Sequence, residues 1–419
     1  MIKNDEILST KKNCVLCESE DLQLLISFPK TPIANHLIPA PNKHPESKLH
    51  PLDLGICNEC GHIQLLTIIS STLLFQNYPY ISVTNPEASN RLISLSTELN
   101  DIFPEKKEKF VIEIGSNDGF LLKNMKKLDW QVLGIDPAEN IAEIALKNGV
   151  ETVIDFFSEE NAIQILKNYR PADLIVANNV LAHSDSLNDI FRGINLLMHE
   201  ESMLIMEFSY VADIFEKLLF DTIYHEHTSY HSVTSLIPFL AKYELVIVKA
   251  IRINAHGGSL RLYIKKQGSN LNKEKSVENL LIHENKIGLN EISAWENFNI
   301  RIHKKSEEIV TLLGKLKSEG HTIVGYGVPA KFATLFHVLD LKPEFFDYLV
   351  DDNELKHGCY GPGTSLVIKS VDELVNNKPD YVFLFSWNYR EQILAKIFKH
   401  HLVSIGTITP LPELLVELF

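Results

Sequence analysis

Two pairs of cysteines near the start of the chain have the spacing of a metal site. Cys14-x-x-Cys17 and Cys57-x-x-Cys60 are separated by 39 residues, and the fifth cysteine, Cys359, lies far away. Each C-x-x-C turn can supply two thiolates to one tetrahedral Zn²⁺ ion. Disulfide pairing is the alternative, but two tight turns without a secretion signal favour zinc. Since such sites are usually structural, we expect the zinc to stabilise a small head and to fix the tyrosines that follow it.

A glycine-containing turn, EIGSNDG at residues 113–119, joins an apolar run to a helical pattern. Glycines let a ligand approach the backbone closely, and the start of the next helix supplies free N–H groups. The spacing does not match the G-x-G-x-x-G dinucleotide fingerprint. The form acid-x-Gly-x-x-x-Gly instead indicates S-adenosylmethionine, because a carboxylate suits its cationic sulfonium and amino groups.

Polar residues at the ends of the next strands extend this donor site. Asp136 ends the second strand, where an acid can accept both ribose hydroxyls. Asp155 and Phe156 follow the third strand and could bracket the adenine, and Asn178 follows the fourth. A capping or turn role is the alternative for each residue alone, but the ordered set favours the methyl donor. The predicted donor-binding residues are Glu113, Gly115, Asn117, Gly119, Asp136, Asp155, Phe156 and Asn178.

A run of titratable residues, YHEHTSYHS at 224–232, follows the last strands of the same region. Such a run is hard to bury without a function. The zinc-protease motif H-E-x-x-H is absent. Two alternatives remain for the run: a metal site on His227 and His231, or a polar loop exposed to solvent. Neighbouring base, acid and phenol groups are better suited to moving a proton. His183, just beyond the fourth strand, is expected to face the methyl donor.

Strands alternating with helices must position these motifs. Such alternation is typical of an α/β fold with a doubly wound parallel sheet, and it restarts near residue 321 as a second Rossmann-like unit. Strands are expected at 110–114, 131–135, 152–154, 173–177, 202–207, 321–325, 346–352 and 381–387, and one long polar helix from about 273 to 316. The predicted regions are a zinc-binding domain (1–75), a donor-binding methyltransferase domain (76–210), an active-site loop and connecting region (211–316) and a Rossmann-like domain (317–419).

Composition excludes several classes of protein. The 419 residues carry a net charge of −14, which argues against nucleic-acid binding. No apolar run reaches about 18 residues, so no transmembrane helix is expected. The start of the chain lacks the apolar region of a signal peptide. We therefore expect a cytoplasmic monomer that binds neither membrane nor nucleic acid.

Together the motifs resemble those of one family, the sugar C-methyltransferases that methylate C-3 of nucleotide-linked 4-keto-6-deoxy sugars. The resemblance spans nearly the whole chain through the cysteine pairs, NYPYIS, EIGSNDG, NNVLAH, YHEH, NAHGGSLR, GYGVPAK and SWNYREQI. It implies a structural zinc, a class I methyltransferase domain that binds S-adenosylmethionine, and a C-terminal Rossmann-like domain that helps hold a dTDP-, CDP- or GDP-linked sugar. The family's catalytic residues fall on Tyr78 or Tyr80, His183, Tyr224, Glu226 and His227.

The resemblance implies a mechanism through an enolate. A ketone at C-4 acidifies the C-3 hydrogen, which His227 would remove as the base. Glu226 would orient or polarise the imidazole, and His183 or Tyr224 would donate to the oxyanion. The enolate carbon would then attack the methyl group.

The remaining motifs give candidate substrate contacts. Arg261 suits a phosphate, Lys331 lies at a helix N-terminus that can seat an anion, and Asn388 can bond a base or sugar. Turn roles are the alternatives. The predicted substrate-binding residues are His225, His256, Arg261, Lys331 and Asn388. Competing functions are methyl transfer to C-5 of the same sugars, an O- or N-methyltransferase, and a zinc-ribbon adaptor without activity.

Overall fold

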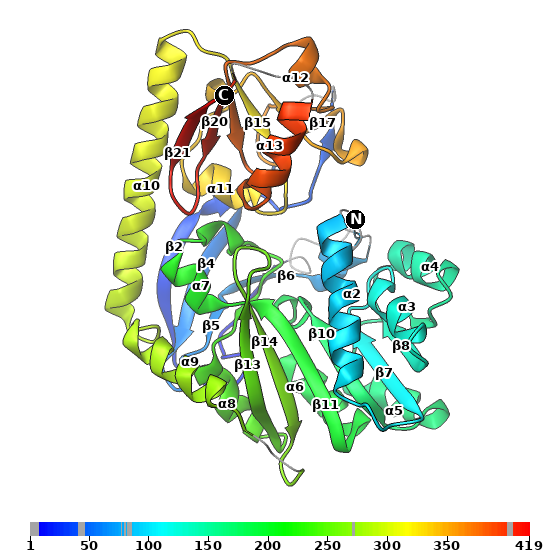
Figure 1. Ribbon diagram of the computed structural model, residues 1–419. Coiled ribbons are helices and arrows are strands. Elements are labelled where there is room, and N and C mark those ends of the chain that lie inside the picture. Colours follow the sequence, from blue (N-terminus) through cyan, green and yellow to red (C-terminus); the bar gives the residue numbers. More distant parts are fainter. Residues whose placement is uncertain are drawn as a thin grey trace.

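Two α/β units and a small head make up the fold (Figure 1). The computed structural model describes residues 8–40, 47–76, 78, 81, 86–269, 273–399 and 405–419. We call residues 8–76 the head, the unit around the larger sheet (residues 86–286) the donor unit, and residues 323–419 the C-terminal unit. The boundaries of the four regions expected from the sequence stay predictions.

The donor unit contains a seven-stranded sheet in the order β13-β14-β11-β10-β7-β8-β9. The five strands from β11 to β9 are parallel, whereas β14 and β13 are antiparallel. The alternating pattern predicts such a largely parallel sheet, and this arrangement is the class I methyltransferase fold that the family resemblance implies. Two of its strands lie beyond residue 210. The bounds are β7 Lys109–Ile114, β8 Trp130–Ile135, β9 Thr152–Val153, β10 Ala172–Asn178, β11 Met198–Ser209, β13 Leu245–Ile253 and β14 Ser259–Lys266.

Helices cover both faces of this sheet, which is why its central strands are apolar runs. Phe110, Ile112 and Ile114 of β7 pack with α5 and α6, and Val111 packs on the other face with α2 and α3. The bounds are α2 Pro86–Asp101, α3 Phe120–Lys126, α4 Glu139–Lys147, α5 Glu159–Asn168, α6 Leu187–Leu197, α7 Val211–Glu216 and α8 Val233–Ala241. The chain leaves β7 toward β8 and later returns to β10 on its other side. The carboxyl ends of β7 and β10 therefore form a topological switch point, where ligands bind in such sheets.

The head is built on a four-stranded antiparallel sheet in the order β12-β5-β4-β2. Its outer strand β12 (Ser229–Tyr230) belongs to the titratable run 224–232, not to the head. The head is therefore tied by backbone pairing to the segment that carries the predicted base. The bounds are β1 Leu8–Thr10, β2 Leu22–Thr31, β3 Ile38–Pro39, β4 His50–Cys57, β5 Ile63–Leu65, β6 Thr67–Ile69 and α1 Ser71–Phe75.

The C-terminal unit has a six-stranded sheet in the order β18-β16-β15-β19-β20-β21. All pairs except β20–β21 are parallel, which confirms a second Rossmann-like unit. The six strands of this sheet are β15 Ile323–Tyr326, β16 Tyr348–Val350, β18 Ile368–Lys369, β19 Tyr381–Leu384, β20 Gly406–Thr409 and β21 Leu415–Leu418. Outside the sheet lie strand β17 Cys359–Tyr360 and the helices α11 Phe332–Val338, α12 Glu373–Asn376 and α13 Arg390–Lys399. Strand β17 pairs with β3 of the head.

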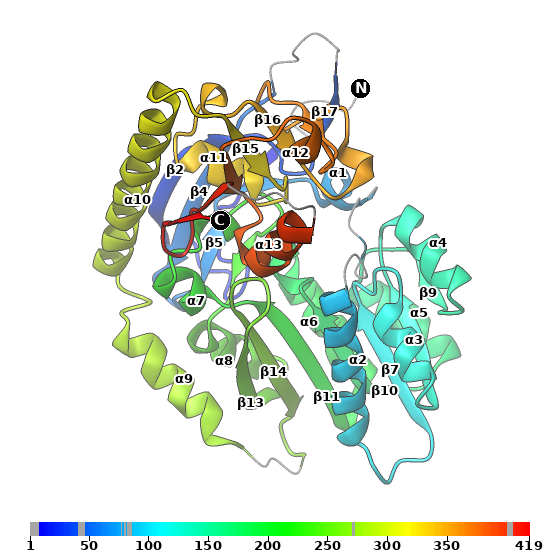
Figure 2. The same ribbon diagram turned by 45° about the horizontal axis from the view of Figure 1, so that its top comes forward.

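The expected single long helix from 273 to 316 is wrong, because two helices occupy this region. Helix α9 (Lys275–Lys286) ends before Gly288, whose φ of +68° is left-handed, and α10 (Ile292–Ser318) starts after it. Glycine adopts this conformation without the Cβ clash that other residues meet, and so it terminates α9. Figures 1 and 2 show α10 running along one side of the molecule to the C-terminal unit.

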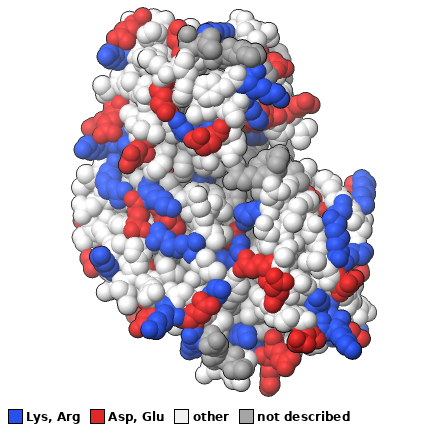
Figure 3. Space-filling view, in the orientation of Figure 1, with Lys and Arg blue, Asp and Glu red and all other residues white. Residues whose placement is uncertain are grey.

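Charged side chains of both signs cover the described face of the molecule. Basic and acidic side chains lie interspersed over the described part of the face in Figure 3. Within the described ranges, no helix has the length and apolar character needed to cross a bilayer.

Candidate active site

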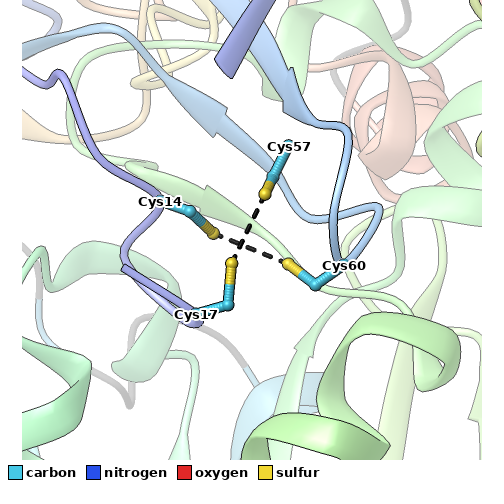
Figure 4. A group of neighbouring side chains, drawn as sticks. All are labelled: Cys14, Cys17, Cys57 and Cys60. Carbon is cyan, nitrogen blue, oxygen red and sulfur yellow. Dashed lines mark hydrogen bonds between the residues drawn. The ribbon is translucent and has the colours of Figure 1, made fainter. Parts of the chain in front are cut away.

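The four cysteines of the head point toward one another (Figure 4). Their sulfur atoms all lie within 4.8 Å of one another, with Cys14–Cys60 at 3.6 Å and Cys17–Cys57 at 3.4 Å. A tetrahedral Zn²⁺ with Zn–S bonds of about 2.3 Å needs sulfur–sulfur distances of about 3.8 Å. The thiols are free rather than paired as disulfides. The donor set and its spacing therefore fit zinc, as the C-x-x-C pairs predict.

Each cysteine pair sits on a tight turn with the same design. The residue after the second cysteine is left-handed in both turns, Glu18 at φ +66° and Gly61 at φ +70°. Its N–H donates to the carbonyl oxygen of the first cysteine, at 2.9 Å in one turn and 2.8 Å in the other. The backbone thereby turns both thiols toward the same point.

The donor loop lies at the switch point between β7 and α3. Gly115, Asn117 and Gly119 have φ values of +69°, +49° and +70°. A Cβ on Gly115 would lie 2.8 Å from Val180, so a side chain has no room there. The Asp136 carboxylate accepts the Asn117 N–H at 2.8 Å and the Ala138 N–H at 2.9 Å. Asp136 thus braces the loop besides standing at the predicted ribose position.

Three polar groups at this switch point are buried and, within the described residues, have no hydrogen-bond partner. They are Glu113 Oε2, Ser116 Oγ and both amide atoms of Asn178. Burial, followed by the charges of Asp118 and Asp136, raises the pKa of Glu113 well above its usual range. Buried polar groups normally have hydrogen-bond partners. These groups could therefore bond to a polar, positively charged ligand such as S-adenosylmethionine. Asp155 and Phe156 are exposed after β9 at the edge of the sheet.

Substitution of Gly115 by alanine is expected to weaken donor binding at least about tenfold, because the Cβ collides with Val180 in a left-handed conformation that costs roughly 1–2 kcal/mol. Calorimetric titration with S-adenosylmethionine measures the effect. Gly314→Ala is the matched control, since this helical glycine of α10 has nothing within 4 Å of an added Cβ. Equal donor affinity of Gly115→Ala and the wild type would contradict the placement of the donor.

The hydrogen bonds around His227 define its protonation. Its Nδ1–H donates to the carbonyl oxygen of Thr222 at 2.9 Å, so in the neutral ring Nε2 carries the lone pair. The Tyr224 hydroxyl donates to this Nε2 at 3.1 Å. Burial, followed by the nearby His183, holds the pKa of His227 well below its usual value. His227 is therefore a neutral imidazole whose basic lone pair lies on Nε2, where it accepts the Tyr224 hydroxyl and could instead accept a proton from a substrate.

His183 lies directly beside this base. The two imidazole centroids are 4.8 Å apart, and Nδ1–H of His183 donates to the carbonyl oxygen of Glu226 at 2.9 Å. Burial lowers the pKa of His183 to about 4, so the ring is neutral. Phe75 of the head packs edge-on against the same ring. The segment after the carboxyl end of β10 and the titratable run therefore meet at one place.

The sequence predicts that Glu226 orients or polarises the His227 ring, but the Thr222 carbonyl oxygen accepts the Nδ1–H instead. The Glu226 carboxylate instead accepts the Asn35 amide N–H at 2.9 Å and the Tyr78 hydroxyl at 3.3 Å. Burial raises the pKa of Glu226 to about 7. Asn140 of α4 donates to the Tyr78 carbonyl oxygen at 2.9 Å, which fixes this tyrosine beside the donor unit. Tyr80, the other predicted tyrosine, lies outside the described residues.

Glu226→Gln is expected to remove a pH dependence of stability. A carboxyl whose pKa rises from 4.5 to about 7 on folding contributes stability that is complete below pH 4.5 and is lost as the pH rises through 7. At pH 8 the glutamine variant should be more stable than the wild type by about 3 kcal/mol, from about 1.4 kcal/mol per pKa unit. Denaturant unfolding at pH 5 and pH 8 measures this, with the exposed Glu344→Gln as control. A difference between wild type and variant that is the same at both pH values would contradict it.

The predicted substrate residues have diverse surroundings. Arg261 is buried, and its guanidinium forms ion pairs with Glu207 at 2.9 Å and Glu98 at 2.8 Å. These pairs do not support a contact with phosphate. His225 turns away to the head and donates to the Pro51 carbonyl oxygen at 3.1 Å. Lys331 donates to the His256 carbonyl oxygen at 3.2 Å, so these two residues lie together. Asn388 is half-buried in the turn Trp387–Tyr389.

Two hydrogen bonds join the C-terminal unit to Asp221 and Ile223, which directly precede the titratable run 224–232. The Trp387 indole N–H donates to the buried Asp221 carboxylate at 2.7 Å, and the Thr334 hydroxyl donates to the Ile223 carbonyl oxygen at 2.8 Å. Sequence reasoning missed these contacts, and it missed Asn35 and the Thr222 carbonyl. Asn35 lies in a proline-rich stretch without a pattern of its own, and any residue type presents a carbonyl. No signal in the sequence marks them.

Known proteins match the chain along most of its length. Three family models match successive parts: a “Putative zinc binding domain” at 14–75, a “Methyltransferase domain” at 88–250 and a “C-methyltransferase C-terminal domain” at 254–412. C-methyltransferase NovU from Streptomyces niveus is 28% identical over 413 residues, which cover 97% of each chain.

Similar solved structures cover under half of this chain. The PH0226 protein of Pyrococcus horikoshii OT3 is 14% identical, with a TM-score of 0.36 over 45% of this chain and 96% of that chain. Magnesium protoporphyrin IX methyltransferase of Synechocystis PCC 6803 is 12% identical, with a TM-score of 0.33 over 42% of this chain and 82% of that chain.

Proposed function

This chain belongs to the C-methyltransferase family, as its resemblance to sugar C-methyltransferases predicted, and we propose that it methylates C-3 of a nucleotide-linked 4-keto-6-deoxy sugar. It is an S-adenosylmethionine-dependent enzyme with a zinc-binding head. The observation that carries the proposal is the neutral His227 with its lone pair on Nε2, next to the Tyr224 phenol. Carbon needs such a base, because it becomes nucleophilic only after it loses a proton.

The proposed donor site and His227 come together near the carboxyl end of β10. Glu113, Gly115, Asp136 and Asn178 would hold S-adenosylmethionine, which supplies an electrophilic methyl group when bound. His183 belongs to the segment directly after Asn178, and its ring packs against His227. The base thereby stands close to the donor, and binding both reactants in one place lowers the entropic part of the barrier.

Proton transfer starts the reaction. His227 Nε2 takes the C-3 proton, and the electron pair of that C–H bond enters an enolate whose negative charge lies on the C-4 oxygen. The Tyr224 hydroxyl, released from Nε2, then donates to this oxygen. The enolate carbon forms the new C–C bond while the methyl–sulfur bond breaks toward sulfur. The protonated imidazole keeps its Nδ1–H bond to Thr222, so the ring does not need to turn.

The C-terminal unit is proposed to hold the nucleotide part of the substrate. Gly327, Asp351 and Trp387 follow the carboxyl ends of its parallel strands. The Trp387 indole N–H donates to Asp221, six residues before His227. Lys331 lies over the Trp387 ring with its Nζ 5.4 Å from the ring centroid, beside His256. A lysine and backbone N–H groups at this junction suit a diphosphate.

A panel of dTDP-, CDP- and GDP-linked 4-keto-6-deoxy sugars with S-adenosylmethionine tests this function. We expect one sugar to gain one methyl group by mass and NMR to place it at C-3. Incubation in D₂O without donor should exchange the C-3 hydrogen of that sugar. A methyl group at C-5, on oxygen or on nitrogen would refute the proposal, as would a protein that binds donor and methylates no member of the panel.

A further inference from the structure

The zinc-binding head reaches into the candidate active site with a polar side chain, that of Asn35. This residue lies in a tight turn after β2, in which the Leu37 N–H donates to the Asn35 carbonyl oxygen at 2.9 Å. The preceding Ala34 is buried and anchors the turn. The Asn35 amide N–H donates to Glu226 Oε1 at 2.9 Å, although the two residues are 191 positions apart in the chain.

Glu226 is a buried acid without a cation. Its side chain is 2% exposed, and the structure forms no ion pair to it within the described part of the chain, where Arg and Lys partners are otherwise common. The carboxylate accepts hydrogen bonds from two neutral groups, the Asn35 amide and the Tyr78 hydroxyl. An unpaired buried carboxylate is costly, so the two donors decide whether Glu226 is ionised.

The charge of the Glu226 carboxylate influences the groups next to it in the site. The charge of Glu226 is, after burial, the main cause that raises the pKa of Tyr224, whose hydroxyl donates to His227 Nε2. The backbone of Glu226 is fixed independently, because its carbonyl oxygen accepts the His183 Nδ1–H. Only the side chain of Glu226 is left to be set by its hydrogen-bond donors.

We propose that Asn35 is a positioning residue of the active site, whose amide orients the Glu226 carboxylate and favours its ionised form beside Tyr224 and His227. The head then supplies a functional group as well as a metal-stabilised support. The link from Glu226 to catalysis rests on the proposed function, but the link from Asn35 to the ionisation of Glu226 does not.

The ionisation can be measured without a sugar. In protein labelled with ¹³C at glutamate carboxyls, the Glu226 signal is assigned by its loss in Glu226→Gln. Asn35→Ala should move its titration to higher pH by about 1–2 units, the equivalent of one hydrogen bond to a charged group. Asn35→Asp should move it further, because two carboxyls in contact share one proton. Asn58→Ala is the matched control, since Asn58 makes the same type of bond to the exposed Asp21, at 2.8 Å, in the same head.

Kinetics give the second readout. The limb of the kcat/KM pH profile that disappears in Glu226→Gln should move to higher pH in Asn35→Ala by the same amount as the carboxyl titration. Donor affinity should be unchanged, since the Asn35 amide bonds to Glu226, which lies outside the donor loop. A purely structural role of Asn35 would lower activity equally at all pH values and would leave the limb in place.

The outcomes separate the two proposals. Wild-type titration of Glu226 in both Asn35 variants overturns the role of Asn35, even if the sugar is methylated. A shifted titration in a protein that methylates none of the sugars supports Asn35 and refutes the substrate. Zinc content and donor affinity report whether a variant folds; if Asn35→Ala loses either, the nearly isosteric Asn35→Asp carries the test.

Discussion

Replacement of His227 by asparagine is expected to lower both C-3 hydrogen exchange and methyl transfer by about 10²–10⁴-fold, the usual contribution of a general base. Asparagine can still donate an amide N–H to the Thr222 carbonyl oxygen, but it has no basic nitrogen in place of Nε2. The loss therefore reports on the lone pair rather than on the hydrogen bond that orients the ring. Exchange in D₂O without donor isolates the proton-transfer step, and single-turnover methylation with donor measures the whole reaction.

Two controls sharpen this result. Donor affinity by calorimetry should stay at the wild-type value, because His227 is not part of the donor loop. Tyr224→Phe keeps the ring packing and removes only the hydroxyl that donates to Nε2. If this hydroxyl stabilises the oxyanion, Tyr224→Phe should lower methyl transfer about 10²-fold or more. Full exchange and turnover in His227→Asn would show that another group is the base.

Removal of the zinc is expected to abolish methyl transfer while donor binding persists. The knuckle Cys57-x-x-Cys60 lies in the turn between β4 and β5, and β5 pairs directly with β12, two residues after His227. A structural zinc typically contributes about 10–16 kcal/mol to the folding of a small zinc-finger peptide. Without it, the β4–β5 turn should open and β12 should lose its partner. The donor loop joins β7 to α3, whereas β4 and β5, which flank the second cysteine pair, pair with β2, β12 and each other.

Cys57→Ser and treatment with a chelator both test this coupling. Zinc content, methyl transfer and donor affinity are measured on the same samples, with Cys359→Ser as the matched control, since Cys359 lies in β17 outside the cluster. Activity should fall with zinc content, and donor affinity should not. A zinc-free protein that keeps the head fold and full turnover would disprove the coupling.

Local features of the fold could be predicted from the sequence. The apolar runs at 110–114 and 173–177 lie in buried parallel strands, since strands covered on both faces need apolar side chains throughout. The glycines of EIGSNDG and the two C-x-x-C pairs prescribe their turns within a few residues, so their backbone shape does not depend on distant segments. Gly288 is a local signal of the same kind, because a glycine at this place ends α9 before α10 begins.

The partners of the catalytic groups were decided only by the tertiary structure. Arg261 suits a phosphate by its chemistry, yet Glu207 and Glu98 occupy it. His225 and His227 differ by two positions, and only folding sends the first to the head and the second to Tyr224 and Thr222. Asn35 meets Glu226 because β12 completes the sheet of the head. Residue types fixed which chemistry was possible, while long-range strand pairing selected the groups that perform it.

The cysteine pairs show both levels at once. Their spacing determined a zinc site, because two turns of four residues are enough to aim four thiols. Their effect on catalysis was expected to pass only through the tyrosine behind the head. The structure adds a second route, the β5–β12 pairing, which no local pattern reveals because a two-residue strand has no sequence signature of its own.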